Sequence, residues 1–202
     1  PTAGMTAWKA VFDNGRAGPG QKVVVNGGAG GTGSFAIQLA RMAGAEVAAT
    51  CSAGNFDYVR SLGASHAIDY RAGSVADAIR AWAPQGVDLI VDTVGQGTFV
   101  DTIETVRRGG VICPIGTLIA DEAPYDPARL TAAGVRVIPT ISDFDSQPRQ
   151  LAGLVEALSA GRIRVPDHVI MPLAEAGRAQ ALVQAGHVRG KILLEVNPAL
   201  GY

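Results

Sequence analysis

The chain has few charged residues and almost no net charge. Only 17% of its 202 residues are charged, and the formal net charge at pH 7 is −1. This balance gives no basic surface of the kind that nucleic acid or an anionic membrane attracts, so we expect neither as a partner. Hydrophobic residues make up 48% of the chain. Low charge with this much apolar material favours a sheet that is covered on both faces.

Cysteines and long apolar runs are also scarce. Cys51 and Cys113 are the two cysteines, and neither belongs to the spacing that a structural zinc site needs. We interpret both as small buried side chains and expect a reducing, cytoplasmic compartment. No stretch reaches the ~20 apolar residues of a membrane-spanning helix. There is no signal-peptide pattern, and the first residue is not Met, so we expect a cut or processed end.

A glycine-rich turn lies between an apolar run and a helix-compatible segment. The run Val23–Asn26 leads into Gly28-x-Gly30-x-x-Gly33, and Ser34–Ala43 follows. Gly28 permits a sharp turn, Gly30 lets the backbone approach a phosphate, and Gly33 allows close helix packing. The order strand, turn, helix predicts a dinucleotide pyrophosphate at the helix N-terminus. The alternative is a glycine-rich loop that only turns the chain.

Strands and helices alternate from about residue 22 to residue 140. This alternation predicts an α/β fold, a Rossmann doubly wound parallel sheet of six strands in the order 3-2-1-4-5-6. The expected strands are Val23–Asn26, Glu46–Thr50, His66–Asp69, Val87–Asp92, Val111–Ile115 and Val135–Ile138. The expected helices are Thr6–Asp13, Ser34–Ala43, Phe56–Leu62, Val75–Trp82 and Phe99–Arg107. Ligand-binding loops should follow the first, fourth and fifth strands: Gly27–Gly33, Val94–Gly97 and Ile115–Leu118.

The C-terminal part falls outside this count of strands. It contains expected helices at Gln147–Ala160 and Ala174–Ala185, and expected strands at His168–Met171 and Lys191–Glu195. These strands either extend the sheet or belong to a neighbouring domain. We divide the chain into a dinucleotide-binding domain, 1–165, and a C-terminal tail, 166–202. Asp121–Pro127 is acidic and contains prolines, which predicts a surface loop.

The second strand lacks the acidic residue that usually reads the ribose of NAD. No carboxylate follows Thr50 until Asp57, whereas Thr50 and Ser52 can donate hydrogen bonds to a 2′-phosphate. This absence favours NADPH as the cofactor, with NADH as the alternative. Arg60 and Arg71 could supply charge, although each by itself is better interpreted as a solvated surface residue.

An ordered set of short motifs extends over essentially the whole chain. Besides the glycine turn, the motifs are Thr6-Ala7-Trp8, Pro19-Gly20-Gln21-Lys22-Val23-Val24-Val25, Leu62-Gly63-Ala64, Asp69-Tyr70-Arg71, Val91-Asp92-Thr93-Val94-Gly95, Gly109-Gly110-Val111, Ile115-Gly116 and Gly190-Lys191-Ile192-Leu193. Together the set resembles the cofactor domain of a medium-chain dehydrogenase/reductase, nearest the zinc-free quinone oxidoreductase branch.

The resemblance implies a role for each matching residue around the cofactor. The pyrophosphate would lie on the glycine turn, the adenosine ribose and its 2′-phosphate at the end of the second strand, and the nicotinamide near the fifth and sixth strands. The residues so assigned are Ala29, Gly30, Gly31, Thr32 and Gly33 for the pyrophosphate; Cys51, Ser52, Asn55 and Tyr70 for the ribose; Val94 and Gly95 for the adenosine side; and Thr6, Ile115, Gly116, Ile138 and Thr140 for the nicotinamide side.

Two departures from the family pattern affect these expectations. Some members carry Lys where this chain has Asn55 and Arg where it has Gly186. Their absence weakens the case for NADPH unless Arg60, Arg71 or Arg189 substitutes.

The second departure is that members begin with a β-rich substrate domain. We therefore expect a fragment whose tail, which packs on that domain in the family, has an exposed apolar surface or one covered by another copy.

The implied reaction is hydride transfer from NADPH to a small-molecule substrate, a quinone or another conjugated carbonyl. We assign no catalytic residue and no metal ligand, because His66, His168 and His187 are better read as structural or solvated, and Asp92 as a loop-positioning group. The alternatives are an enoyl reductase domain of the same family and a non-catalytic nucleotide-binding protein. Val135–Ile138 at the sheet edge favours a homodimer through that edge.

Overall fold

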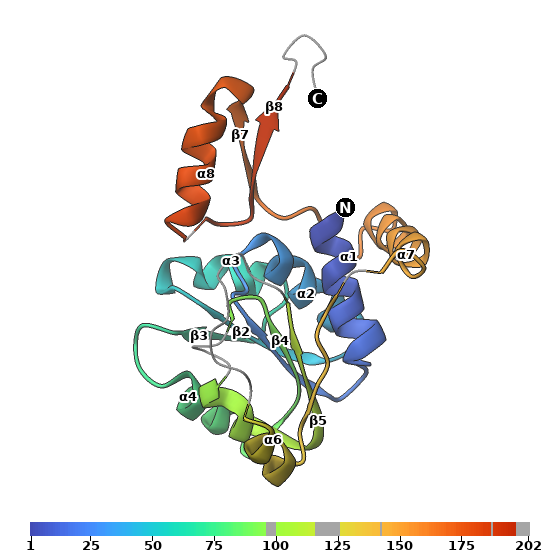
Figure 1. Cartoon of the computed structure of the whole chain (residues 1–202), viewed down its shortest axis with the longest axis vertical. Helices are drawn as coiled ribbons and strands as arrows, with labels where there is room; N and C mark the ends of the chain where they lie inside the picture. The colour runs from blue at the N-terminus through green and yellow to red at the C-terminus, as the bar shows by residue number, and fades with distance from the viewer. Residues whose placement is uncertain (96–99, 116–125, 142, 187, 197–202) are drawn as a thin grey trace.

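Six parallel strands form one sheet in the order β3-β2-β1-β4-β5-β6 in the computed structural model (Figure 1). The structure describes residues 1–95, 100–115, 126–141, 143–186 and 188–196. The strands are β1 Lys22–Asn26, β2 Glu46–Cys51, β3 His66–Asp69, β4 Val87–Asp92, β5 Val106–Pro114 and β6 Arg136–Val137. This order confirms the predicted doubly wound sheet.

Helices cover both faces of the sheet. Figure 1 shows α1, α2 and α3 on one side and α4 and α6 on the other. The α-helices of this body are α1 Thr2–Trp8, α2 Gly31–Met42, α3 Phe56–Ser61, α4 Val75–Trp82, α6 Pro127–Ala133 and α7 Gln147–Ser159. A π-helical segment η1, Lys9–Asn14, continues α1, and short 3-10 turns lie at η2 Ala53–Asn55 and η3 Val100–Thr105. The sheet and the helices on its two faces form a three-layer α/β arrangement.

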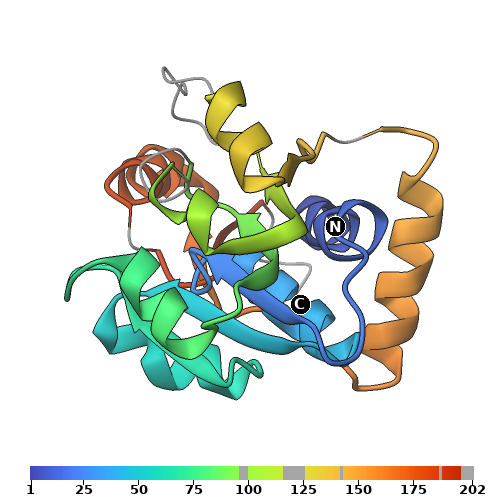
Figure 2. The same ribbon diagram turned by 90° about the horizontal axis from the view of Figure 1, so that it is seen from below.

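Alternating strand residues divide the core into two clusters. Val23 and Val25 of β1 face the cluster that contains α2, whereas Val24 between them faces the cluster that contains Ile79 of α4. Successive side chains of a strand point to opposite faces, so the run of valines fills both. Figure 2 shows α7 beside α1 at the margin of the first layer. Burial on both faces explains why these strands are apolar throughout.

The segment from η3 into β5 differs from the expected elements, and β6 is the two residues Arg136–Val137 within the expected Val135–Ile138. The segment expected as a helix over Phe99–Arg107 forms, within the described residues, the 3-10 turn η3, and β5 already begins at Val106. Val106 is buried and pairs with Val87, and the register then shifts before Leu89. Gly109 with its φ of +83° therefore belongs to an irregularity inside a strand and does not end a helix.

The N-terminal helix is longer than expected and α6 was missed. The helix expected over Thr6–Asp13 begins at Thr2 and passes into η1. Pro127, expected to close a surface loop, instead begins α6, and residues 121–125 of that loop lie outside the described residues. The Asp126 carboxylate accepts a hydrogen bond from the Ala128 N–H at 2.9 Å, and Gly134 ends the helix in the left-handed region.

The C-terminal strands do not extend the main sheet. β7 His168–Pro172 and β8 Lys191–Glu195 pair with each other as a separate parallel ladder. Between them lie the turn η4 Leu173–Glu175 and the helix α8 Ala176–Gln184, so the expected helix Ala174–Ala185 begins as a 3-10 turn. Figure 1 shows this β7–α8–β8 unit standing apart from the body. The division of the chain at residue 165 stays a prediction.

The β7–α8–β8 unit and the segment leading into it expose many large apolar side chains. The exposed residues are Val165, Val169, Ile170, Leu173, Leu182, Val183, Leu193, Leu194 and Val196. An apolar surface of this extent is what we expected of the tail. Among the described residues, no helix is both long and apolar enough to cross a membrane.

Candidate functional site

The glycine turn is fixed to the neighbouring strand by hydrogen bonds from two backbone N–H groups to Thr50. β1 ends at Asn26, and Gly27 has a φ of +74°, a region that side chains rarely adopt. The Gly27 N–H donates to the Thr50 hydroxyl oxygen at 3.0 Å, and the Gly28 N–H donates to the Thr50 carbonyl at 2.9 Å. The sharp turn that we assigned to Gly28 is thus made at Gly27, and β2 holds it in place.

Two of the three predicted glycines are needed because other atoms lie close to them. A Cβ added at Gly33 would lie 2.2 Å from the Gly27 carbonyl oxygen, which brings α2 directly against the turn. A Cβ at Gly28 would lie 2.8 Å from the Ala49 Cβ. A Cβ added at Gly30 would lie 3.4 Å from its nearest neighbour, the Gly27 carbonyl oxygen, so protein packing does not require glycine at this position. Its backbone remains accessible to a ligand.

The first turn of α2 has no capping side chain. Gly30 is the N-cap, and among the described residues no side chain accepts a hydrogen bond from the first helical N–H groups. Such groups have no partner inside the helix, and the helix dipole adds partial positive charge at the same end. The predicted pyrophosphate residues Gly31, Thr32 and Gly33 lie in this turn, and Ala29 and Gly30 lie immediately before it. The arrangement can bind an anionic group.

Lys191, to which sequence reasoning gave no role, lies at this turn. The Gly190 N–H donates to the Ala29 carbonyl at 2.8 Å, and Gly190 pairs with Gly30 as an isolated bridge. A Cβ at Gly31 would lie 2.8 Å from the Lys191 Nζ. An exposed cation therefore lies over the N-terminus of α2. The available signal was the Gly190-Lys191 motif near the end of the chain, which the resemblance included without assigning its function.

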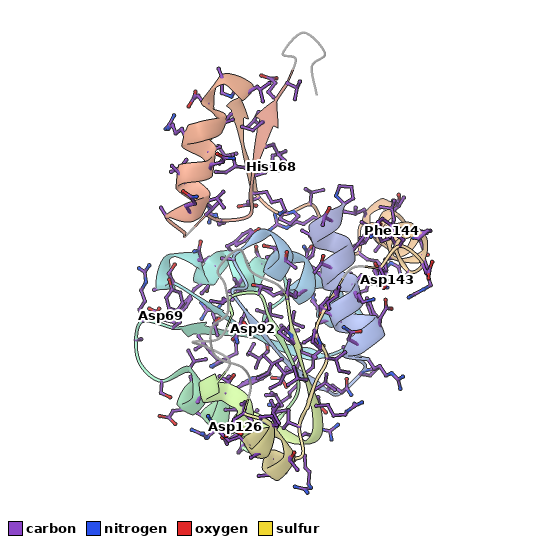
Figure 3. All side chains as sticks on the ribbon, viewed as in Figure 1. Asp69, Asp92, Asp126, Asp143, Phe144 and His168 are labelled. Atoms are coloured by element: carbon purple, nitrogen blue, oxygen red, sulfur yellow. The ribbon has the colours of Figure 1, made fainter. Side chains whose placement is uncertain are left out.

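The residues predicted for the adenosine ribose gather at the ends of β2 and β3. Cys51 pairs with Asp69, which places Ser52 beside Tyr70, and the Asn55 side-chain amide donates to the Ser52 Oγ at 3.1 Å. Burial raises the pKa of the Cys51 thiol to about 11, with a further increase from the Asp69 carboxylate and a smaller opposing effect of Arg60. Figure 3 labels Asp69 at the end of β3.

The three arginines considered for a 2′-phosphate have different surroundings. The Arg60 guanidinium lies 5.4 Å from the Phe56 ring on its own helix. The Arg71 guanidinium lies 5.4 Å from the ring of the adjacent Tyr70, at the end of β3. Arg189 pairs with Asp167 at 3.4 Å and lies over the Tyr58 ring. Arg71 therefore contacts the predicted ribose residue Tyr70, and Arg60 lies close enough to lower the pKa of another, Cys51.

On the other side of β1, buried polar groups shape the loop after β4. The buried Asp92 carboxylate accepts hydrogen bonds from the Val94 and Gly95 N–H groups, at 3.1 and 3.3 Å, which confirms its loop-positioning role. Figure 3 shows Asp92 near the middle of the sheet. Asn26, which pairs with Asp92, is fully buried, and within the described residues its side-chain nitrogen has no hydrogen-bond partner.

The residues predicted for the nicotinamide side lie on three elements. Thr6 is half-buried on α1, Ile115 pairs with Thr140 as an isolated bridge, and Ile138 packs against the core. Gly116 lies outside the described residues. Burial raises the pKa of the Cys113 thiol, in β5, to about 12. A hydrogen bond with the Thr140 side chain has a smaller effect that lowers the same pKa.

The described residues offer neither a metal site nor an obvious acid for proton transfer. No group of three or more His, Cys, Asp and Glu side chains that could hold a metal ion occurs in them. Of the three histidines, His66 and His168 are exposed, and His187 is outside the described part of the chain.

A cavity of about 670 Å³ lies at the base of the β7–α8–β8 unit, lined mainly by apolar side chains together with Asp167, His168 and Arg189.

Comparison with known proteins identifies the family. Residues 31–159 match the family described as zinc-binding dehydrogenase. The chain belongs to this family. Its resemblance to quinone oxidoreductases among the medium-chain dehydrogenases/reductases is also confirmed. Despite the name of the family, the described residues contain no set of side chains that fits a zinc ion.

Three relatives illustrate the range of similar proteins. The quinone oxidoreductase from Coxiella burnetii is 30% identical with a TM-score of 0.82, over 98% of this chain and 59% of that one. Mycobacterial Rv1454c complexed with NADPH is 28% identical with a TM-score of 0.88, over 96% and 62%. The polyketide synthase GfsB of Streptomyces halstedii is 35% identical over 210 residues, 99% of this chain and 4% of its own length.

The chain is shorter than the relatives that it matches. It spans 60% and 63% of two curated relatives that are 32% and 28% identical to it. The activity of the whole protein is therefore given as a proposal.

Proposed function

We propose that this chain is the cofactor-binding part of an NADPH-dependent oxidoreductase that transfers hydride to a quinone or another conjugated carbonyl. The observation that carries the proposal is the glycine turn, where an uncapped helix N-terminus meets the side chain of Lys191. A diphosphate needs both N–H donors and positive charge, and this turn presents the two together. Membership of a dehydrogenase family supports the same assignment.

The residues at the glycine turn fit the pyrophosphate of a dinucleotide. The N–H groups of Gly31, Thr32 and Gly33 would bind the pyrophosphate, and Lys191 would neutralise its charge. When bound, the dinucleotide supplies the hydride from its nicotinamide ring, and the protein supplies orientation and exclusion of water.

The preference for NADPH rests on the end of β2. The one carboxylate of β2, Glu46, is at the opposite end of the strand, and we expect Ser52, Tyr70 and Arg71 to offer hydroxyl and guanidinium groups to a 2′-phosphate. The nearest acid, Asp69, accepts a hydrogen bond from the Arg71 N–H at 2.9 Å. Mycobacterial Rv1454c, a relative of 28% identity whose structure contains NADPH, also supports this preference.

A titration tests binding without requiring the substrate part of the protein. The purified chain should change the fluorescence of NADPH in a saturable manner and should bind NADH more weakly. Absence of saturation with both nucleotides would rule out the proposal. Hydride transfer itself should be measured on the longer protein with its preceding sequence, using a quinone and an enone as acceptors.

An enoyl reductase of the same family is the second candidate. The observation in its favour is the 35% identity with a polyketide synthase over nearly the whole chain. A quinone can be reduced without a dedicated protein acid, whereas an enoyl substrate requires a proton donor near its α-carbon. Faster turnover of an enoyl thioester than of any quinone would favour this candidate, and binding without any turnover would favour a non-catalytic protein.

We also propose a homodimer through the edge of the sheet and a cytoplasmic location. β6 is only two residues long and pairs on one side with β5. Close after it, Ile141 is 72% exposed and Phe144 is 89% exposed. Unpaired strand groups beside exposed apolar side chains are typical of a surface that pairs with another copy. Light scattering should give twice the chain mass, and Phe144→Asp should reduce it to that of one chain.

A further inference from the structure

A set of hydrogen bonds joins the β7–α8–β8 unit to the glycine turn. The Gly190 N–H donates to the Ala29 carbonyl at 2.8 Å, and the next N–H, of Lys191, donates to the Asp167 carbonyl at 3.0 Å. Gly190 is required here, because a Cβ on it would lie 1.7 Å from the same Asp167 oxygen. The backbone that carries Lys191 is thus held by the turn on one side and by Asp167 on the other.

Asp167 is in turn held by the side chain of Tyr58. The Asp167 N–H donates to the Tyr58 hydroxyl at 3.2 Å, and that hydroxyl lies 3.1 Å from the Ser34 Oγ. The Ser34 hydroxyl donates to the Gly30 carbonyl at 2.6 Å. The connection therefore returns to the glycine turn and closes a ring that passes through Tyr58, Asp167 and Gly190. A connected network of hydrogen bonds of this kind keeps its members in one arrangement.

Tyr58 is well placed to maintain this ring. Its side chain comes from α3, is only 6% exposed, and packs in the cluster below α2. The Arg189 guanidinium lies 5.2 Å from its ring and pairs with Asp167 at 3.4 Å. The aromatic ring thus packs against Arg189, two residues before Lys191, while the hydroxyl group fixes the position of Asp167.

We infer that Tyr58 is a positioning residue for dinucleotide binding, acting through Asp167 to hold Lys191 over the pyrophosphate site. The inference rests on the proposed function. Without the hydroxyl group, the Asp167 N–H loses its acceptor, and the backbone segment that anchors Lys191 can shift. The Lys191 ammonium group is at the end of a flexible side chain, so its position over the turn depends on the position of its backbone.

Substitution of Tyr58 by phenylalanine is the direct test. Tyr58→Phe removes the hydroxyl group and keeps the ring that packs under Arg189. We expect the Kd for NADPH, measured by fluorescence, to rise about three- to tenfold, the effect of one buried hydrogen bond. Thr105→Val is the matched control, because it removes a buried hydroxyl whose bond goes to the Thr102 carbonyl, away from the ring. Its Kd should equal that of the unaltered chain.

A double-mutant cycle separates positioning from general support of the fold. In a Lys191→Gln background, Tyr58→Phe should have little further effect on the Kd, because the charge that it positions is already absent. Equal weakening in both backgrounds would overturn the inference, as would an unchanged Kd in Tyr58→Phe alone. Failure of the unaltered chain to bind NADPH would overturn the proposed function, and the inference with it.

Hydrogen exchange on the unaltered chain provides a test that does not depend on a variant folding. NADPH should slow exchange at the amides of Asp167, Gly190 and Lys191, because the bound pyrophosphate stabilises the ring that these amides close. Slower exchange confined to residues 27–34, with no change at 167 and 190–191, would show that binding is not coupled to the ring and would overturn the inference.

Discussion

Gly33 offers the sharpest test of how the turn is built. A Cβ at this position would lie 2.2 Å from the Gly27 oxygen and 2.9 Å from the Gly28 Cα. Both atoms are backbone, so no side chain can rotate away. The helix would have to move from the strand by several tenths of an ångström or more. In the Gly33→Ala variant, we therefore expect α2 to separate from the turn and the pyrophosphate site to lose its geometry.

The magnitude follows from two opposing effects. Overpacking of this kind costs about 3 kcal/mol, whereas alanine gains about 1 kcal/mol over glycine from helix propensity. The net loss of unfolding free energy is then about 2 kcal/mol, which for a chain of this size lowers the Tm by roughly 4–8 °C. NADPH binding should fall below detection, since the N–H groups of the first turn move together.

Gly177→Ala is the matched control. Gly177 also lies in the first turn of a helix, α8, but a Cβ there meets nothing within 4 Å. This variant should gain up to about 1 kcal/mol and bind NADPH as before. Thermal unfolding followed by circular dichroism, with a fluorescence titration, measures both quantities. Equal stability and equal affinity in Gly33→Ala and the unaltered chain would refute the reasoning.

Three further predictions follow from individual side chains. Lys191→Gln should weaken NADPH binding about tenfold and make it less sensitive to salt. Cys51 and Cys113, with pKa values raised to about 11 and 12 by burial, should not react with a thiol reagent at pH 8 until the chain is unfolded. Hydrogen bonds from Lys9 and Ser146 lower the pKa of Asp143, so its contribution to stability should be complete above about pH 4 and decline as the pH falls further. The Tm difference between Asp143→Asn and the unaltered chain should thus stay constant above about pH 4 and narrow as the pH falls from about 4 to about 2.

The main sheet could be predicted because its strands are distinct in sequence. The strands β3 and β4 and the helix α4 have the predicted bounds, since each is an apolar segment closed by a clear turn or capping signal. At the N-terminus of α4, the Ser74 hydroxyl accepts a hydrogen bond from the Asp77 N–H at 3.1 Å. Where turn and capping residues agree with the way a segment packs, the sequence pattern alone predicts the bounds of the helix or strand.

Other parts depend on contacts that no local pattern reveals. β5 begins early because Val106 is buried against Val87, a tertiary contact between separate segments. Lys191 reaches the glycine turn only because Gly190 pairs with Gly30, which is far away in the sequence. The predicted residues on the ribose side lie together because β2 and β3 are neighbours, which follows from the strand order. The roles assigned to them in binding stay predictions.

The central claim is that the glycine turn binds the pyrophosphate of a dinucleotide. A crystal structure of the chain with NADPH tests it most directly. We expect the phosphate oxygens within hydrogen-bond distance of the Gly31–Gly33 N–H groups and of the Lys191 Nζ. A dinucleotide bound elsewhere on the molecule, with the turn closed by protein atoms, would contradict the claim.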